Sequence, residues 1–320
     1  MRSWLVSFIN GDKEVYHDMS KTKIYKNSKA GRAIIESYDL LLRMWDINIE
    51  ETDIPGRYGT THVIKAGDSD KPPLVLFHGV GDDAALMWIY NAKELGDHFH
   101  IFAVDTIGGP GKSVPGEGYD KTFDDEVWIS ELLEKLGLDK VFMAGVSNGA
   151  YLTQMYTARH PERVIRGVSM AGVPVKSSNG KADAMKAMMK VFLPEALFPT
   201  DNNVKKLVRK MTGSNYAAFV GNETVFLHFK QLMTGFNRSA MMNHKVVGLT
   251  EEEIFSLKDR LLCIVGKMDP FIMLGGEKLT EELGRYPLRV IFMDDAGHGI
   301  NHEKAQEVDR LIVDYLYGRS

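Results

Sequence analysis

The sequence predicts an α/β protein built on a doubly wound, mostly parallel sheet. Short apolar runs such as Leu74 to Phe77 and Val141 to Ala144 recur along the chain, with the length of strands buried on both faces. Segments whose apolar residues have helical spacing separate these runs. Glycine-containing turns follow several runs, and they would lie at the carboxyl edge of a parallel sheet, where ligands usually bind.

The first 46 residues are expected to form an N-terminal helical extension. Ser28 can cap a helix over residues 28–45, in which Ile34, Tyr38 and Trp45 fall on one face. From residue 47 onward strands and helices alternate, which assigns residues 47–176 and 248–320 to the core. We expect strands at residues 74–77, 101–104, 141–144, 164–168, 261–265 and 290–293. A helix between two of them carries Leu132 and Leu133, with Thr122 and Asp125 as its capping box.

Residues 177–247 interrupt the alternation, and we expect a helical cap there. They contain no clear strand run but have helical stretches at residues 182–192, 203–211 and 223–233. Seven of the chain's 17 methionines fall in this interval, and flexible thioethers suit a surface that adapts to apolar ligands. Met188, Met189 and Phe229 are therefore candidate substrate-binding residues. Methionines that only pack the small helices together explain the composition equally well.

Composition and charge narrow the class of protein. Lysine and arginine total 39 against 43 aspartates and glutamates, a net charge of −4 without a dense basic run, so nucleic acid is not an expected partner. The one cysteine, Cys263, lies in an apolar run and is expected to be a buried thiol in a reducing compartment. No signal peptide is evident, and no run approaches the ~18 apolar residues of a membrane span. We expect a cytoplasmic protein.

Ser147 is the candidate nucleophile. It is the centre of Gly145-Val146-Ser147-Asn148-Gly149, which fits the nucleophile-elbow pattern G-x-S-x-G. The pentapeptide alone is weak evidence, but a buried strand runs into it and a helix follows it. A serine on so tight a turn has strained backbone angles, and it projects its hydroxyl over the sheet edge.

Two further strand ends supply the partners that a serine hydroxyl requires, namely a base and a carboxylate that orients the base. Asp269 follows the strand at residues 261–265, and His298 follows the strand at residues 290–293. The chain order Ser147, Asp269, His298 predicts a catalytic triad without a metal or cofactor. The turn at His78-Gly79-Val80-Gly81 follows another buried strand, and its glycines expose the backbone. We expect the backbone N–H groups of Val80, in this turn, and of Asn148, next to Ser147, to be the oxyanion donors. His78 is expected to brace the loop through hydrogen bonds of its side chain.

Together these motifs resemble those of the α/β-hydrolase superfamily, in particular its capped, esterase-like members. The resemblance covers residues 47–318, through H-G-V-G at 78–81, D-T-I-G-G-P-G-K-S at 105–113, G-V-S-N-G at 145–149, G-K-M-D at 266–269 and G-H-G at 297–299. It implies an eight-stranded core with the cap inserted after the sixth strand. The helical extension before residue 47 departs from the commonest pattern.

We therefore expect a serine carboxylesterase that cleaves small to medium apolar esters through an acyl-enzyme. A serine at the elbow disfavours epoxide opening and dehalogenation, which use an aspartate nucleophile there. Thioesterase, amidase or aminopeptidase, carbon-carbon hydrolase and perhydrolase activities stay open, as does a non-hydrolytic small-molecule receptor on the same fold. The motifs do not define the oligomeric state.

Overall fold

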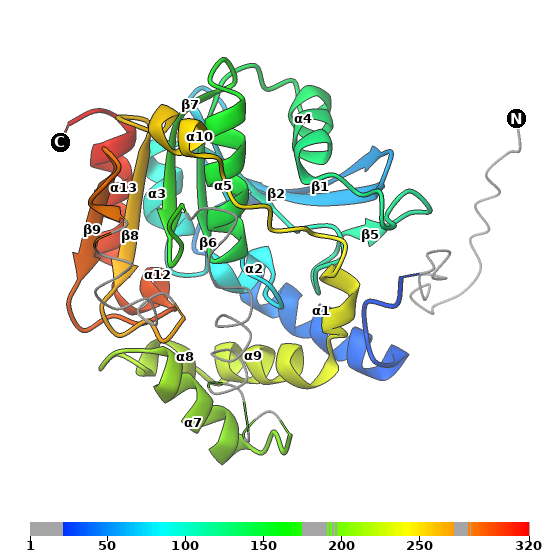
Figure 1. The fold of residues 1–320 in the computed structure, drawn as a ribbon. Coiled ribbons are helices and arrows are strands. Elements are labelled where there is room, and N and C mark those ends of the chain that lie inside the picture. Colours follow the sequence, from blue (N-terminus) through cyan, green and yellow to red (C-terminus); the bar gives the residue numbers. More distant parts are fainter. Residues whose placement is uncertain are drawn as a thin grey trace, which may run out of the picture.

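The computed structural model describes residues 22–174, 191, 193, 195, 197–271, 281 and 283–319. Within these residues a nine-stranded sheet runs in the order β1-β2-β4-β3-β6-β7-β8-β9, and β5 pairs with β2 beside this path (Figure 1). The six neighbouring strands from β4 to β9 along this path pair in parallel. The predicted doubly wound, mostly parallel sheet is confirmed; its path has the expected eight strands, and the two-residue β5 is a ninth. The strands are β1 (Ile49–Gly56), β2 (Gly59–Ala66), β3 (Pro73–Phe77), β4 (His100–Val104), β5 (Val114–Pro115), β6 (Val141–Val146), β7 (Val164–Met170), β8 (Leu261–Gly266) and β9 (Arg289–Met293).

The sheet begins with an antiparallel hairpin that the six apolar runs did not include. β1 pairs with β2 along its whole length, and β2 pairs antiparallel with β4. β1 is an edge strand with mostly exposed or half-buried side chains, so it lacks the continuous apolar run of a central strand. Edge strands of this kind give a weak sequence signal.

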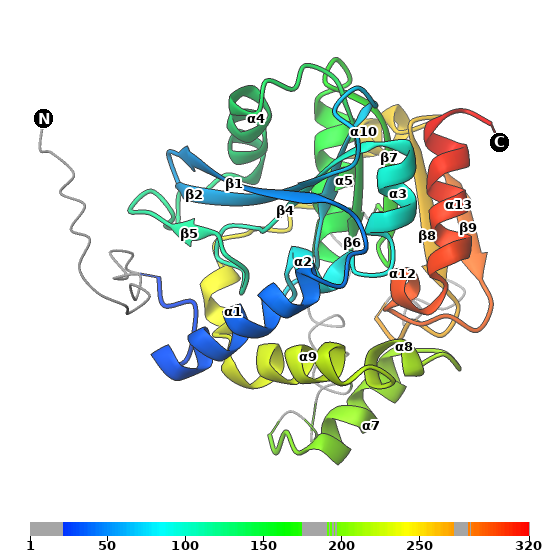
Figure 2. The ribbon, with the colours of Figure 1, turned by 180° about the vertical axis from the view of Figure 1, so that it is seen from behind.

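Helices cover both faces of the sheet (Figure 2). One face packs against α1, α2, α3 and α13, and its cluster includes Tyr38, Trp88 and Ile312. The other face packs against α4, α5 and α10 and includes Trp128 and the buried Cys263. The helices on the core are α1 (Ser28–Leu42), α2 (Ala84–Met87), α3 (Ala92–His98), α4 (Asp125–Lys135), α5 (Asn148–Arg159), α10 (Glu251–Ser256), α12 (Ile300–Glu303) and α13 (Ala305–Leu316).

Two predicted helix starts were wrong by one or two residues. Asn27, not Ser28, caps α1, because its side chain accepts the Ala30 N–H at 2.9 Å. Asp124 caps α4 by accepting two backbone N–H groups, so the expected capping box of Thr122 and Asp125 does not form. Asp and Asn cap as well as Ser and Thr do, so neighbouring candidates cannot be ranked from sequence.

Between β7 and β8 the chain leaves the core to form the cap. The predicted helices at 203–211 and 223–233 correspond to α7 (Asp201–Met211) and α9 (Glu223–Gly235), with α8 (Ala217–Val220) and the 3₁₀ turn η1 (Arg238–Met241) beside them. The predicted helix at 182–192 lies outside the described residues except for Val191. The limits of 177 and 247 stay a prediction.

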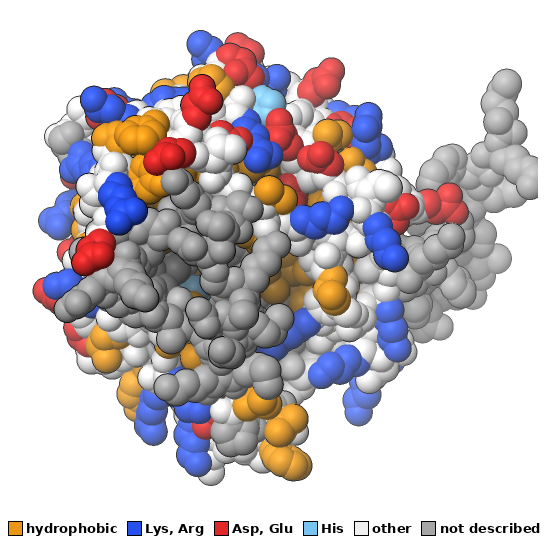
Figure 3. All heavy atoms as spheres, viewed as in Figure 1, with side chains coloured by type: hydrophobic (Ala, Val, Ile, Leu, Met, Phe, Trp, Pro, Cys, Tyr) orange, Lys and Arg blue, Asp and Glu red, His pale blue; other side chains and the backbone are white. Residues whose placement is uncertain are grey.

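Helix α7 is strongly amphipathic. Val204, Leu207 and Val208 are buried, and the opposite face exposes four cations. These are Lys205, Lys206, Arg209 and Lys210. The lower edge of the molecule accordingly carries several Lys and Arg side chains in Figure 3. None of the described helices combines the length and apolarity that crossing a bilayer requires.

Candidate active site

Ser147 lies between the end of β6 and the start of α5, in a strained conformation. Its φ is 58° and its ψ is −111°, a region that non-glycine residues avoid at a cost of about 1–3 kcal/mol. A Cβ on Gly145 would lie 2.1 Å from the carbonyl oxygen of Gly149, and a Cβ on Gly149 would lie 2.2 Å from that of Phe77. The two glycines therefore permit a turn that no larger residue would allow.

Backbone hydrogen bonds hold this turn. The Ser147 N–H donates to the Met170 carbonyl of β7 at 2.9 Å, and the Ser147 carbonyl accepts the Tyr151 N–H at 3.2 Å. Asn148 is the first residue of α5, and the first N–H groups of a helix have no partner within it. The positive end of the helix dipole next to Ser147 favours an anion there, and the role of the Asn148 N–H as an oxyanion donor stays a prediction.

The loop of residues 78–83 joins β3 to α2 and lies against Ser147. A Cβ on Gly79 would come within 3.3 Å of the Ser147 Cβ. His78 is fully buried, and its Nε2 accepts the Thr106 N–H at 2.9 Å. Its Nδ1 therefore carries the proton and donates it to the Gly79 carbonyl at 2.8 Å. Burial lowers the pKa of His78, which keeps the ring neutral.

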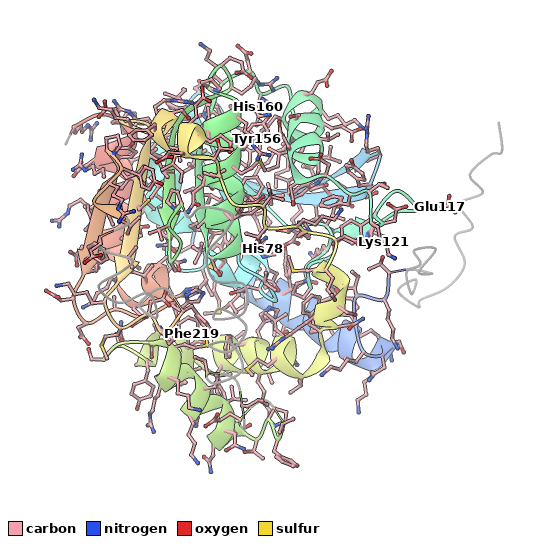
Figure 4. The ribbon with its side chains drawn as sticks, viewed as in Figure 1. His78, Glu117, Lys121, Tyr156, His160 and Phe219 are labelled. Atoms are coloured by element: carbon pink, nitrogen blue, oxygen red, sulfur yellow. The ribbon has the colours of Figure 1, made fainter. Side chains whose placement is uncertain are left out.

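His78 thus connects the 78–83 loop to the segment after β4, and Figure 4 shows it at the lower end of α5. Its two ring nitrogens are both used in these backbone contacts, so the ring is a brace and not a free base. The bracing contacts predicted for His78 are present. The Val80 N–H belongs to the same loop, and its role as an oxyanion donor stays a prediction.

Asp269 and His298 meet at the same edge of the sheet. Asp269 follows β8 and is fully buried, and His298 lies in the loop between β9 and α12 with its side chain 17% exposed. The Asp269 Oδ2 lies 2.7 Å from the His298 Nδ1, and the other carboxylate oxygen accepts the Phe271 N–H at 2.8 Å. A buried carboxylate at this nitrogen fixes the proton on Nδ1 and leaves Nε2 available as a base.

Two carboxylates that precede His298 in its own loop, Asp294 and Asp295, are rivals for the role of orienting the histidine, but both are engaged elsewhere. Asp294 pairs with Lys267 at 2.6 Å, and it is largely exposed. Asp295 accepts the Ser214 N–H of the cap at 2.8 Å and also bonds the Ser214 hydroxyl. The structure therefore brings Asp269, and neither rival, to His298 Nδ1.

The His298 loop is also fastened to the cap. The His298 N–H donates to the Met211 carbonyl at the end of α7, at 2.6 Å. The buried Glu303 carboxylate accepts the Gly297 N–H at 3.0 Å and the Gly213 N–H at 2.5 Å. Burial raises the pKa of Glu303, so the carboxylate depends on these N–H donors. The α7 to α8 turn and the His298 loop thus form one hydrogen-bonded unit.

The candidate substrate-binding residues are only partly described. Met188 and Met189 lie outside the described residues. Phe229 lies on α9, half-buried, and its ring centroid is 5.6 Å from that of Phe219. Figure 4 shows Phe219 on α8. Phe219 in turn lies 4.6 Å from the ring of His302. Phe229 therefore belongs to an aromatic contact between cap and core, and its contact with a substrate stays a prediction.

His302, four residues after His298, is a core histidine. It is buried, its Nε2 donates to the Leu86 carbonyl at 3.0 Å, and burial lowers its pKa to about 4. A ring held neutral between α2 and the aromatic residues of the cap acts as packing. His298 contacts Asp269 whereas His302 contacts the Leu86 carbonyl, so the two histidines do not act together despite their spacing of four residues.

Residues that sequence reasoning missed surround the 78–83 loop. Asp83 ends this loop, and its carboxylate meets His228 of α9 in a fully buried pair. A histidine in a cap helix and the second of two adjacent aspartates carry no motif. The one sequence feature that could have pointed to this loop as functional was the pair of aspartates, Asp82 and Asp83, directly after a buried strand and a glycine turn.

The chain matches known hydrolases over most of its length. The family model described as alpha/beta hydrolase fold matches residues 72–305. The carboxylesterase YbfK of Bacillus subtilis is 24% identical over 91% of this chain and 95% of its own length. A carboxylesterase named nap, from the same organism, is 34% identical over 43% of this chain and 45% of its own length.

Solved structures agree on the fold. The crystal structure of naproxen esterase from Bacillus subtilis superposes with a TM-score of 0.75 at 23% identity, over 91% of this chain and 99% of that one. The structure of carboxylesterase CesB (YbfK) gives a TM-score of 0.74 at 22% identity over the same shares.

Proposed function

Because the chain belongs to the α/β-hydrolase family, we propose that it is a serine carboxylesterase that cleaves small to medium apolar esters with Ser147, His298 and Asp269. The observation that carries this proposal is the strained serine at the elbow together with the 2.7 Å contact between buried Asp269 and His298. Relatives named carboxylesterases support the same reaction.

The reaction follows from the roles of these groups. His298 Nε2 takes the Ser147 proton as the hydroxyl oxygen attacks the ester carbonyl, and Asp269 stabilises the imidazolium. The N–H groups of Asn148 and Val80 hold the oxyanion. The tetrahedral intermediate collapses, the leaving alkoxide takes the proton from His298, and an acyl-enzyme remains. Water, activated by the same histidine, then releases the acid and regenerates Ser147.

The cap would select the acyl or alcohol group, because it covers the sheet edge and is fastened to the His298 loop through Met211 and Glu303. We also place the protein in the cytoplasm, which suits the single buried thiol of Cys263.

The test is a substrate panel on the purified chain. p-Nitrophenyl esters, a thioester, an aryl amide and a vinylogous diketone are compared, and Ser147→Ala is the blank for each. We expect kcat/KM to be highest on the esters and to vanish in the blank. A higher value on the diketone would assign carbon-carbon hydrolysis to the same serine. Turnover that survives Ser147→Ala would refute the proposal.

A further inference from the structure

A fully buried chain of polar side chains joins the N-terminal extension, the cap and the 78–83 loop. The His228 Nε2 of α9 lies 2.7 Å from the Asp83 Oδ2, and the His228 Nδ1 lies 2.6 Å from the Ser37 Oγ of α1. The side chains of His228 and Asp83 have no exposure, and Ser37 is 2% exposed. Substrate cannot reach this serine, histidine and aspartate, so they are not a second catalytic triad.

The residue after Ser37 makes a second, parallel connection. The Tyr38 hydroxyl donates to the Asp105 Oδ2 at 2.9 Å, and both residues are fully buried. Asp105 follows β4, and its other oxygen accepts the Ala84 N–H at 2.9 Å. Consecutive residues of α1 therefore connect to two different buried carboxylates: Ser37 to Asp83 through His228, and Tyr38 to Asp105 directly. Figure 2 shows α1 lying along α9 and beside α2, where these connections are made.

Both carboxylates hold the first turn of α2. The Asp83 Oδ1 accepts the Leu86 N–H at 3.0 Å as the helix cap, while Asp105 holds the N–H of Ala84. Residues 78–83 precede this turn directly, so fixing the turn fixes the downstream end of the loop. The upstream end is fixed by the contacts of His78 with Thr106 and Gly79. The Val80 N–H lies between the two anchors.

Charge explains why the pair with His228 matters. Contact with His228 lowers the pKa of Asp83 against the effect of burial, so the carboxylate stays ionised without solvent. Removing the imidazole would leave an uncompensated charge in the core, which is strongly destabilising. The carboxylate would then move toward water or take up a proton, and the loop that it ends would move with it.

We propose that α1 and His228 are positioning elements of the oxyanion site: through Asp83 and Asp105 they hold the 78–83 loop so that the Val80 N–H faces the developing oxyanion. The proposal rests on the esterase function above. It gives the helical extension a task, since an enzyme lacking α1 would lose both Ser37 and Tyr38.

The test compares His228→Leu, the double variant His228→Leu with Asp83→Asn, and the wild-type protein. In the double variant no buried charge is left unpaired, but the contact that ties residue 83 to α9 is still missing. We expect kcat on an aryl ester to fall about 10- to 100-fold in both, with KM within about threefold, since small misplacement of a donor costs about this much. The melting temperature should fall in the single variant and recover largely in the double.

His160→Gln is the matched control, because His160 is also a histidine held by carboxylates, those of Glu126 and Glu162, but it follows the end of α5 that is far from Ser147. It should lose stability without a change in kcat. Hydrogen exchange of the peptide covering residues 77–87 supplies a readout that needs no substrate, and exchange at Ala84 and Leu86 should be at least about tenfold faster in His228→Leu.

These measurements distinguish a positioning role of His228 from a role in stability or in substrate binding. A kcat that recovers together with the melting temperature in the double variant would reduce His228 to a stability role and overturn the proposal. A raised KM with unchanged kcat would mean that His228 affects substrate binding instead of the oxyanion site. Unchanged hydrogen exchange would mean that other contacts hold the loop. Either result also overturns the proposal. A wild-type chain without esterase activity refutes the proposed function instead, and the exchange measurement still reports on the anchoring.

Discussion

Asp269→Asn is the sharpest test of the triad, because the structure dictates how the asparagine must orient. One carboxylate oxygen of Asp269 accepts the Phe271 N–H, and the other faces the His298 Nδ1. The Phe271 N–H can only donate, so the asparagine oxygen stays at Phe271 and the amide NH₂ turns toward His298. The ring must then present an unprotonated Nδ1 and carry its proton on Nε2.

The size of the effect follows from that tautomer. A histidine protonated on Nε2 cannot accept the Ser147 proton, and the imidazolium that forms during attack loses its buried counter-charge. Loss of the orienting aspartate in such triads lowers kcat about 10⁴-fold, or ~5 kcal/mol of activation free energy. The fold should survive, since the substitution keeps the volume of the side chain.

The assay is steady-state hydrolysis of p-nitrophenyl butyrate, with Asp294→Asn and Asp295→Asn as matched controls. Asp294→Asn should stay within about twofold of wild type, because it breaks only an exposed ion pair with Lys267. Asp295→Asn should cost more than that and far less than Asp269→Asn, since Asp295 holds Ser214 of the cap. If Asp269→Asn keeps more than about a tenth of the activity, or if a control is worse, Asp269 is not the orienting acid.

Four further outcomes are expected. A phosphonate should label Ser147 alone, as read by peptide mass spectrometry, and Ser147→Ala should take up no label. In a series from acetyl to palmitoyl esters, kcat/KM should rise roughly fourfold per carbon and then fall when the pocket is full, with a weaker rise in Phe229→Ser; a flat profile in both proteins would mean an open site. Because burial raises the pKa of Cys263 to about 12, iodoacetamide at pH 8 should leave the folded protein unmodified and label it only after denaturation. Burial raises the pKa of Asp309 to about 8, so the folded state binds the proton more tightly than the unfolded state does, and stability should fall as pH rises from about 4 to 8. Asp309→Asn should remove much of that fall in melting temperature. An unchanged pH profile in the variant would mean that other groups cause the fall.

The core strands, the elbow turn and the chain order of the site residues could be predicted, because the sequence patterns that indicate them involve neighbouring residues. A strand buried on both faces must be apolar throughout, and this requirement revealed β3, β4, β6, β7 and β8 in the sequence. β9 has the same kind of apolar run, although it is an edge strand whose side chains are mostly half-buried. The elbow needs glycines at 145 and 149 whatever else the protein does, since backbone atoms approach there too closely for a Cβ. Parallel strands end at one edge, so Ser147, Asp269 and His298 were expected to lie at that edge.

The polar interior could not be predicted, since hydrogen-bond partners there are far apart in sequence. Ser37 and His228 are 191 residues apart, and His228 and Asp83 are 145 apart. No motif within a few residues of any of them identifies its hydrogen-bond partner. The same holds for Glu303, which fastens the His298 loop to the cap across 90 residues.

The sequence by itself therefore determined the fold class, the positions of the strand ends and the residue types placed there, because strand burial and tight turns constrain neighbouring residues. Only the tertiary structure decided which residues cap α1 and α4, and which residues of the cap and the extension contact Asp83 and Asp105. Polar groups in a core are stable only when every donor and acceptor is matched, and that matching exists only once distant segments have come together.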